Sequence, residues 1–220
     1  MNMKLDHSER LLAQLNELFD LTPCPPSEYE TFQMVGLDFK AQGYESAKLG
    51  HVSVQTASGM GGAMEMESMI VNPFSVDGPL FSLDLISAQG KYTLMMELYD
   101  TLVDTPRDEA PFQAIKDRYA HIMDIPHKPN WYDDIQYHAS CAKLATPEQA
   151  EDLSKLIMTY GQRYVELLKD AAPCDVQRKR VKADAYRDGL LSHGGPATDA
   201  FLKFWGPEKT GKLFTEVLFG

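Results

Sequence analysis

The sequence has few cysteines, and none of them lies at metal-binding spacing. The three, Cys24, Cys141 and Cys174, are odd in number and far apart along the chain. Because no C-x-x-C pair or Cys/His cluster with ligand spacing is present, the pattern argues against a zinc or iron–sulfur site. We therefore expect buried free thiols and no bound metal.

Positive charge and long apolar runs are also scarce. The chain has 21 basic and 32 acidic residues, which gives a formal net charge of −11. This balance argues against non-specific binding to nucleic acid or to an anionic membrane. No apolar run reaches membrane-spanning length, and the first residues lack the apolar core of a signal peptide. The expectation is a monomeric cytoplasmic protein.

The common catalytic signatures are missing as well. The sequence contains no phosphate-binding loop, no dinucleotide-binding fingerprint, no G-x-S-x-G and no H-E-x-x-H. The glycine-rich residues 59–62 fit a hairpin between two strands better than a phosphate cradle. The six histidines are scattered, and His193 stands out because it ends a predicted helix just before Gly194, Gly195 and Pro196.

The order of the predicted elements indicates an α+β fold in a single domain over residues 1–220. Strands come first and helices come later, and the short turns between strands favour an antiparallel meander. Residues 28–39 fit neither pattern. The periodicity predicts strands over residues 46–56, 63–71, 80–87, 91–99 and 135–144, and helices over residues 6–20, 109–124, 146–169, 175–191, 196–204 and 207–219.

The strand at residues 80–87 carries one acid among apolar residues. With period two, Ser82, Asp84 and Ile86 share one face, while Phe81 and Leu83 share the other. Asp84 could lie on the wet face of an antiparallel sheet. It could instead lie in a ligand pocket, where burial would raise its pKa until it holds a proton near neutral pH.

Two neighbouring strands also mix acids with methionines. Glu67 and Met69 share one face of the strand at residues 63–71, and Thr93 and Glu97 share one face of the strand at residues 91–99. Methionines more often fill gaps in a core, although beside polar residues they also suit the wall of a flat apolar site. The basic cluster at residues 178–182 fits a solvated helix face or a docking patch for an acidic partner.

Several segments together resemble the ferredoxin-dependent bilin reductases. The run P-L-F-S-L-D-L-I at residues 79–86 resembles the family strand "P-hydrophobic-F-G-x-D-hydrophobic-V". The loop P-N-W at residues 129–131 is similar to "L-P-x-W-G", and residues 195–219 are similar to the ending "D-P-A-T…F-G-E-E…F-L-F". Red chlorophyll catabolite reductase, a relative of the same fold, is also similar around residues 91–98 and at the C-terminus.

The resemblance implies a three-layer α/β/α sandwich with a central antiparallel sheet flanked by helices. A linear tetrapyrrole such as biliverdin would lie between the sheet and the C-terminal helices. The family holds no tightly bound flavin, nicotinamide or metal. Electrons arrive singly from reduced ferredoxin, and side chains supply the protons.

Carried over residue by residue, the resemblance assigns the central proton donor to Asp84 and a second acid to Glu67. The family's earlier glutamate falls on Gln55, and a hydroxyl that can meet a propionate falls on Thr93. The loop tryptophan falls on Trp131.

The expected pocket also includes Met69 and Ser82. Two positions depart from the family pattern: Gly195 replaces an aspartate that many members carry, and Tyr132 replaces the loop glycine. His193 and Asp199 are the nearest ionisable residues to Gly195, so we expect His193 to assist catalysis.

A gapless count places Gln55, Glu67 and Asp84 on one face of three successive strands. The resemblance therefore implies a bilin oxidoreductase that uses ferredoxin as electron donor, or, as the alternative, a tetrapyrrole carrier of the same fold that performs no reduction.

Overall fold

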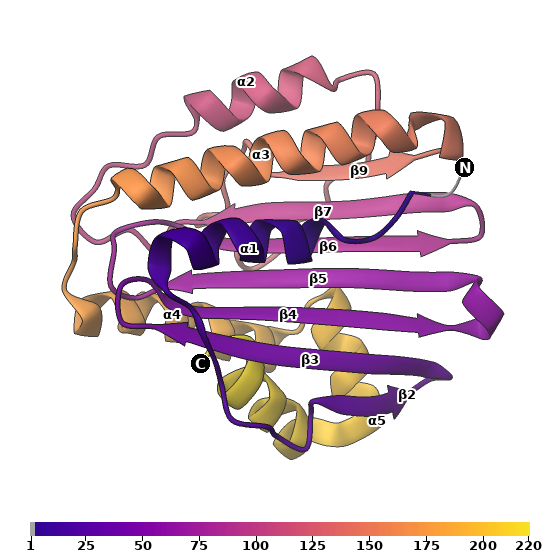
Figure 1. Cartoon of the computed structure of the whole chain (residues 1–220), viewed down its shortest axis with the longest axis horizontal. Coiled ribbons are helices and arrows are strands. Elements are labelled where there is room, and N and C mark those ends of the chain that lie inside the picture. Colours follow the sequence, from indigo (N-terminus) through magenta and orange to yellow (C-terminus); the bar gives the residue numbers. More distant parts are fainter. Residues whose placement is uncertain (1–2) are drawn as a thin grey trace.

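One antiparallel sheet organises the part of the chain that the computed structural model describes, residues 3–220 (Figure 1). Its strand order is β1-β3-β4-β5-β6-β7-β9-β8, and β2 pairs with the outer part of β3. The meander predicted from residues 46–99 is confirmed. The strands are β1 (Thr22–Pro23), β2 (Thr31–Met34), β3 (Leu37–Ser46), β4 (Gly50–Gly59), β5 (Met64–Pro73), β6 (Leu80–Ala88), β7 (Lys91–Tyr99), β8 (Met123–Asp124) and β9 (Cys141–Ala145).

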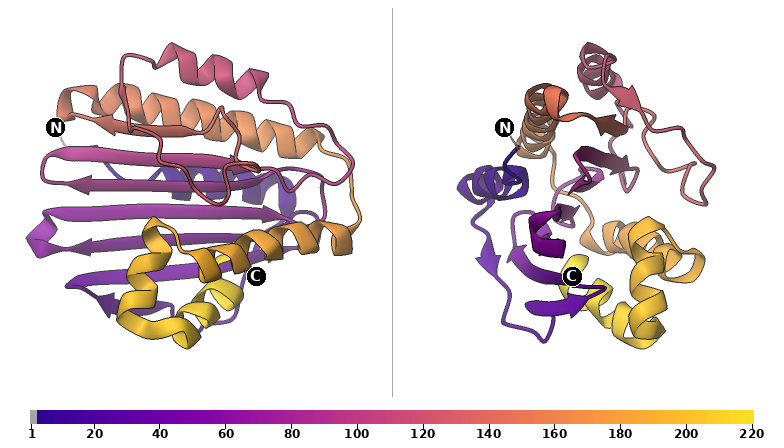
Figure 2. Two further views of the ribbon diagram at one scale, coloured as in Figure 1. Left: turned by 180° about the vertical axis from the view of Figure 1, so that it is seen from behind. Right: turned by 90° about the vertical axis from the view of Figure 1, so that its right-hand side faces the viewer.

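Helices cover both faces of this sheet, so the three-layer arrangement expected from the sequence is confirmed (Figure 2). Helices α1 (His7–Phe19) and α3 (Ala150–Asp170) lie on one face, and α2 (Ala110–Arg118) packs against α3. The other face carries α4 (Val176–His193), α5 (Pro196–Leu213) and the π-helical turn η3 (Phe214–Leu218). Short 3-10 turns are η1 (Met60–Gly62) and η2 (Pro147–Gln149). Among the described helices, none combines the length and apolar composition needed to cross a bilayer.

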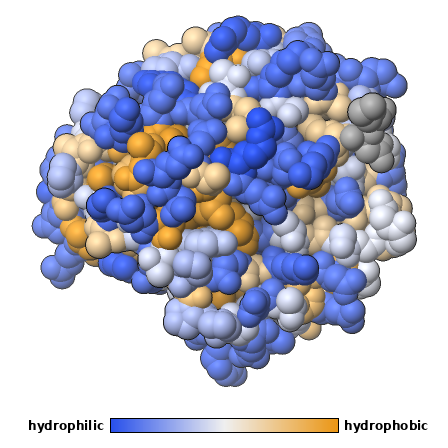
Figure 3. Space-filling model, in the orientation of Figure 1, coloured by the Kyte–Doolittle hydropathy of each residue, from blue (hydrophilic) through white to orange (hydrophobic). Residues whose placement is uncertain are grey.

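The larger part of the hydrophobic core lies between the sheet and α1 and α3. Alternate residues of β6 and β7, among them Leu83, Leu85 and Met96, are fully buried there. They pack with the apolar stripe of α3 that the sequence pattern predicted, which includes Leu153, Leu156 and Tyr160. In the same orientation, much of the visible surface is hydrophilic, and the hydrophobic residues gather mainly in one area left of the centre (Figure 3).

The C-terminal turn is held to the sheet by side chains from β4 and β5. His51 Nε2–H donates to the carbonyl oxygen of Val217 (2.8 Å), Ser53 Oγ–H to that of Leu218 (2.9 Å), and Asn72 Nδ2–H to that of Phe219 (3.0 Å). Carbonyls at the end of a helix lack intrahelical donors, so these bonds satisfy groups that would otherwise need water.

Some predicted boundaries are wrong. The segment at residues 46–56 is the end of β3, a turn and the start of β4, and the unassigned residues 28–39 contain β2 and the beginning of β3. The helix predicted at residues 109–124 ends at Arg118. The break predicted between residues 204 and 207 is present inside α5, where Gly206 has φ 76° and Pro207 follows it.

Candidate functional site

Asp84 lies in a row of directly paired residues that crosses four strands. Gln55 of β4 pairs with Ser68 of β5, Ser68 with Asp84 of β6, and Asp84 with Met95 of β7. Because paired residues of antiparallel strands point to the same side, these four side chains share one face, called here the Asp84 face. This is the face covered by α4, α5 and η3, since Tyr99 of the same face packs on Tyr186 of α4.

The Asp84 face remains accessible along β6 and β7. Between Phe81 and Ile86, buried residues alternate with partly exposed ones, and the same alternation runs from Tyr92 to Leu98. The buried set lies under α1 and α3, whereas the partly exposed set includes Asp84. The C-terminal helices therefore cover this face incompletely.

Burial raises the pKa of Asp84 above its usual value, although a hydrogen bond with the Ser68 side chain offsets part of the effect. On its own face the carboxyl lies between Ser68 of β5 and Met95 of β7. Taking charge out of water is costly, so the neutral form is favoured. Asp84 is therefore not a fully solvated carboxylate, and its role toward a ligand stays a prediction.

A second carboxyl on the same face belongs to Glu97. It lies opposite Ser82, one position diagonal to Asp84. Tyr99 Oη–H donates to one carboxyl oxygen (2.8 Å) and Gln136 Nε2–H to the other (2.6 Å). Burial is the main cause that raises the pKa of Glu97 to about 7, and the charge of Asp84 raises it further. Two acids with raised pKa values therefore lie side by side.

Sequence reasoning placed Glu97 on a face with Thr93 but gave it no role. The missing information was the pairing of β6 with β7, which puts this face next to Asp84. The signal that could have indicated Glu97 was its position two residues after Met95, on a strand that follows the one carrying Asp84.

Gln55 adds a buried polar group to the Asp84 row. Its side chain is 6% exposed, and its amide Nε2 has no hydrogen-bond partner among the described residues. An unpaired buried donor costs about 1–3 kcal/mol, so this amide favours a bound acceptor. The sequence correctly predicted that Gln55 and Asp84 share a face.

Aromatic side chains border the face at the end of β7. Tyr99 contacts Tyr186 (ring centroids 4.1 Å apart) and Tyr132 (5.6 Å). Trp131 lies against Tyr132 (5.2 Å), and its Nε1–H donates to the carbonyl oxygen of Gly194 (3.1 Å). Tyr132 occupies the position of the family's loop glycine and fills this border with a buried ring.

His193 lies at the exposed end of α4, with its ring centroid 5.6 Å from that of Trp131. Asp199, the other ionisable residue near Gly195, accepts a hydrogen bond from the Gly195 backbone N–H (3.3 Å). The structure therefore places His193 beside the tryptophan loop, and its catalytic role stays a prediction.

The expectation that Glu67 faces Asp84 is wrong. Glu67 pairs with Leu85 and points to the opposite face, under α1. There it accepts hydrogen bonds from His7 Nδ1–H (2.6 Å), the Ser8 backbone N–H (2.9 Å) and Ser8 Oγ–H (2.8 Å). Burial alone would raise the pKa of Glu67, but these hydrogen bonds outweigh it and lower the pKa. The gapless count was one residue off, because Ser68 is the residue of β5 that faces Asp84.

The same one-residue shift moves Met69 away from the expected pocket. Met69 pairs with Leu83 and is 1% exposed in the core under α1 and α3. Ser82 and Thr93 do lie on the Asp84 face, opposite Glu97 and Ile86 respectively, and both are partly exposed.

The basic cluster of α4 is largely used within the protein. Lys179 is fully buried and bonds to Asp77 (3.4 Å) and to the Gly78 carbonyl. Arg178 pairs with Asp104 (3.0 Å), and Lys182 donates to the Leu102 carbonyl. These contacts fix α4 against the loops around β6 and β7, so the cluster as a whole is not a free docking patch.

Comparison with known proteins gives a match in structure alone. No protein-family model and no curated protein sequence matches this chain. Among solved structures, phytochromobilin synthase from tomato in complex with biliverdin superposes with a TM-score of 0.78 and 13% sequence identity, over 96% of this chain and 80% of that one. Phytochromobilin synthase is a ferredoxin-dependent bilin reductase. The resemblance read from the sequence is thus confirmed in the architecture, and this chain has the fold of a bilin reductase.

Proposed function

We propose that this protein reduces a linear tetrapyrrole of the biliverdin type, with electrons delivered one at a time by reduced ferredoxin. The observation that carries the proposal is the pair of carboxyls with raised pKa values, Asp84 and Glu97, on the accessible face of a bilin-reductase fold. The protein uses no tightly bound cofactor in this scheme, because the tetrapyrrole itself accepts the electrons.

Asp84 is the proton donor. Reduction of one double bond consumes two electrons and two protons, so each single-electron step leaves a radical or anion that takes up a proton. Burial raises the pKa of this carboxyl, which favours its protonated form, and a protonated carboxyl can release its proton to a stronger base. Glu97 holds a second proton, and its bonds to Tyr99 and Gln136 keep it fixed beside Asp84.

The remaining residues of the face bind the tetrapyrrole. The unpartnered amide of Gln55 donates to a lactam oxygen, and the partly exposed hydroxyls of Ser82 and Thr93 meet polar groups of the ligand. Apolar side chains between them, such as Met95, contact the flat conjugated rings. Trp131 and its loop border the site.

A second candidate function is a carrier that binds the tetrapyrrole without reducing it. Gly195 favours this alternative, since the resemblance puts an acid at that position and the nearest one, Asp199, already accepts from the Gly195 backbone. A carrier needs the apolar face and the Gln55 donor, but it needs no acid with a raised pKa.

Absorbance spectroscopy separates the two functions. Biliverdin is added first, and then reduced ferredoxin with its reductase. We expect a shift of the biliverdin bands on binding, followed by new bands that form through a transient radical. A shifted spectrum that electrons leave unchanged would establish the carrier, and no shift at all would overturn both functions.

Asp84→Asn tests the proton donor. This variant should bind biliverdin and form the radical, but single-turnover reduction should slow at least 100-fold because the donated proton is missing. Glu65→Gln, an exposed change on β5, is the matched control and should reduce at the normal rate. Unchanged turnover by Asp84→Asn would remove Asp84 from the mechanism.

A further inference from the structure

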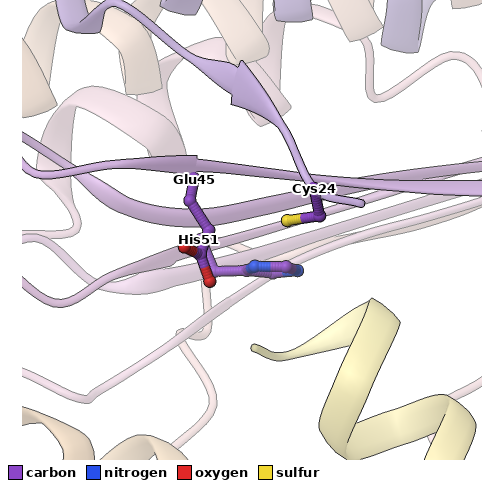
Figure 4. A group of neighbouring side chains, drawn as sticks. All are labelled: Cys24, Glu45 and His51. Carbon is purple, nitrogen blue, oxygen red and sulfur yellow. The ribbon is translucent and has the colours of Figure 1, made fainter. Parts of the chain in front are cut away.

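Three potential metal ligands meet at the β1–β3–β4 edge of the sheet. Cys24 follows β1, Glu45 lies near the end of β3, and His51 lies near the start of β4. Glu45 pairs directly with His51. One ligand atom from each residue lies within 4.8 Å of the other two, and the thiol, the carboxylate and the imidazole gather in one place (Figure 4).

His51, one of the three residues, has a ring nitrogen with an unused lone pair. Its ring is 1% exposed, and its Nε2 bonds to the carbonyl oxygen of Val217 (2.8 Å). A carbonyl can only accept, so Nε2 carries the proton and Nδ1 of the neutral ring carries the lone pair. Nδ1 has no hydrogen-bond partner among the described residues. A backbone carbonyl that fixes the tautomer in this way is the usual outer partner of a metal-bound histidine.

Gly43 makes room for the cluster. A Cβ atom at this position would lie 2.9 Å from His51 Cε1 and 3.4 Å from Cys24 Sγ. The absence of a side chain therefore lets the imidazole and the thiol approach each other over the middle of β3. The backbone supports this placement, because the Cys24 N–H donates to the Gly43 carbonyl oxygen (2.9 Å).

We propose that Cys24, Glu45 and His51 form a binding site for Zn²⁺. Sulfur, nitrogen and carboxylate oxygen are the ligands that Zn²⁺ takes in proteins, and three protein ligands leave a fourth position for water. A groove of about 450 Å³, lined in part by Glu45, His51 and Arg180, gives the ion access. On binding, the Cys24 thiol releases its proton to solvent and coordinates as the thiolate.

Small movements complete the coordination. Bond lengths of about 2.0–2.3 Å around a tetrahedral ion place the ligand atoms about 3.5 Å apart. Glu45 is exposed and Cys24 is half-buried, so both side chains can move inward while the buried imidazole stays in place. The sequence spacing argued against a metal site because it cannot show that strand pairing brings residues 24, 45 and 51 together.

Titration with Co²⁺ tests the thiolate ligand in protein that contains no tetrapyrrole. We expect one Co²⁺ per chain, a thiolate-to-cobalt charge-transfer band, and displacement by Zn²⁺. Cys24→Ser should lose the band, while Cys174→Ser, which changes another half-buried cysteine, should keep it. No band in the unmodified protein, or a band that survives in Cys24→Ser, would overturn the proposal.

Calorimetric titration with Zn²⁺ tests the other two ligands. His51→Gln and Glu45→Gln should each weaken Zn²⁺ binding at least tenfold, and the exposed change His121→Gln should not. Because Glu45 is exposed, its variant keeps the test independent of folding. Equal affinity in all three variants would reject the site. Since biliverdin is absent from both titrations, their outcome is independent of the proposed reduction.

Discussion

The carboxyl of Glu97 should make the protein less stable as the pH rises toward neutrality. Its pKa is raised from the usual 4.5 to about 7 in the folded protein. Between these values the folded state binds more protons than the unfolded state, so the free energy of unfolding falls as the pH rises. The favourable contribution of the protonated group is complete below about pH 4.5 and is lost above about pH 7.

The size of the effect follows from the two pKa values. Their difference, 7 − 4.5, at about 1.4 kcal/mol for each pH unit, gives an upper limit between about 3 and 4 kcal/mol. Solvent reaches the partly exposed carboxyl and reduces this figure, so we expect about 1.5–3 kcal/mol. Glu97→Gln keeps the shape and an acceptor for Tyr99 but removes the titration. It should be more stable than the parent by this amount above pH 7 and about equally stable near pH 4.5.

Urea unfolding at a series of pH values measures this difference. The slope of unfolding free energy against urea should be the same in both proteins, so that midpoint shifts report stability. Glu65→Gln removes an exposed carboxyl from β5 and is the control. In Asp84→Asn, the loss of unfolding free energy that Glu97 causes at high pH should also be smaller, because the charge of Asp84 raises the Glu97 pKa. If Glu97→Gln shows the same pH dependence as the parent, the two-carboxyl reasoning is refuted.

Two further variants test the corrected face of Glu67 and the position of Trp131. Glu67→Gln should lower the unfolding free energy by about 1.5–3 kcal/mol, because the variant loses charge-assisted hydrogen bonds to His7 and Ser8. The affinity for biliverdin should stay unchanged. Weakened binding without a loss of stability would contradict the placement of Glu67 under α1. Gly189→Ala puts a Cβ atom 2.2 Å from the Trp131 ring, so this variant should displace the indole. The fluorescence of Trp131, measured in a Trp205→Phe background, should then change. An unchanged emission spectrum would contradict the contact.

The sequence predicted the architecture well because period and turn signals are local. In β6 and the strands on either side of it, buried and partly exposed positions alternate clearly. The turns between them, rich in Pro and Gly, are too short for anything but an antiparallel meander. The strand β3 was missed in part because Gly43 and Glu45 follow Phe39 and Ala41 at the positions where the alternation would place apolar side chains.

The site could be predicted only in part, because the register of strand pairing decides which side chains share a face of the sheet. A shift of one residue turns every side chain of a strand to the other side, and counting back across a loop carries that uncertainty. The count placed Gln55 correctly and Glu67 wrongly, since the register across the connections at η1 and at residues 73–79 is visible only in the strand pairing itself. The pairing of Asp84 with Glu97 likewise depends on the β6–β7 register.

The three donors on β4 and β5 that hold the carbonyls of residues 217–219 have a consequence for the order of folding. The surface of β4 and β5 that receives these carbonyls exists only once the meander has formed. The contacts span about 150 residues or more, which makes their closure late and slow. The sheet with α1 and α3 should therefore form one cooperative unit, and the C-terminal layer a second, less protected one. Hydrogen exchange would then be faster in α4 and α5 than in β5 and β6, because this layer can open without unfolding the rest.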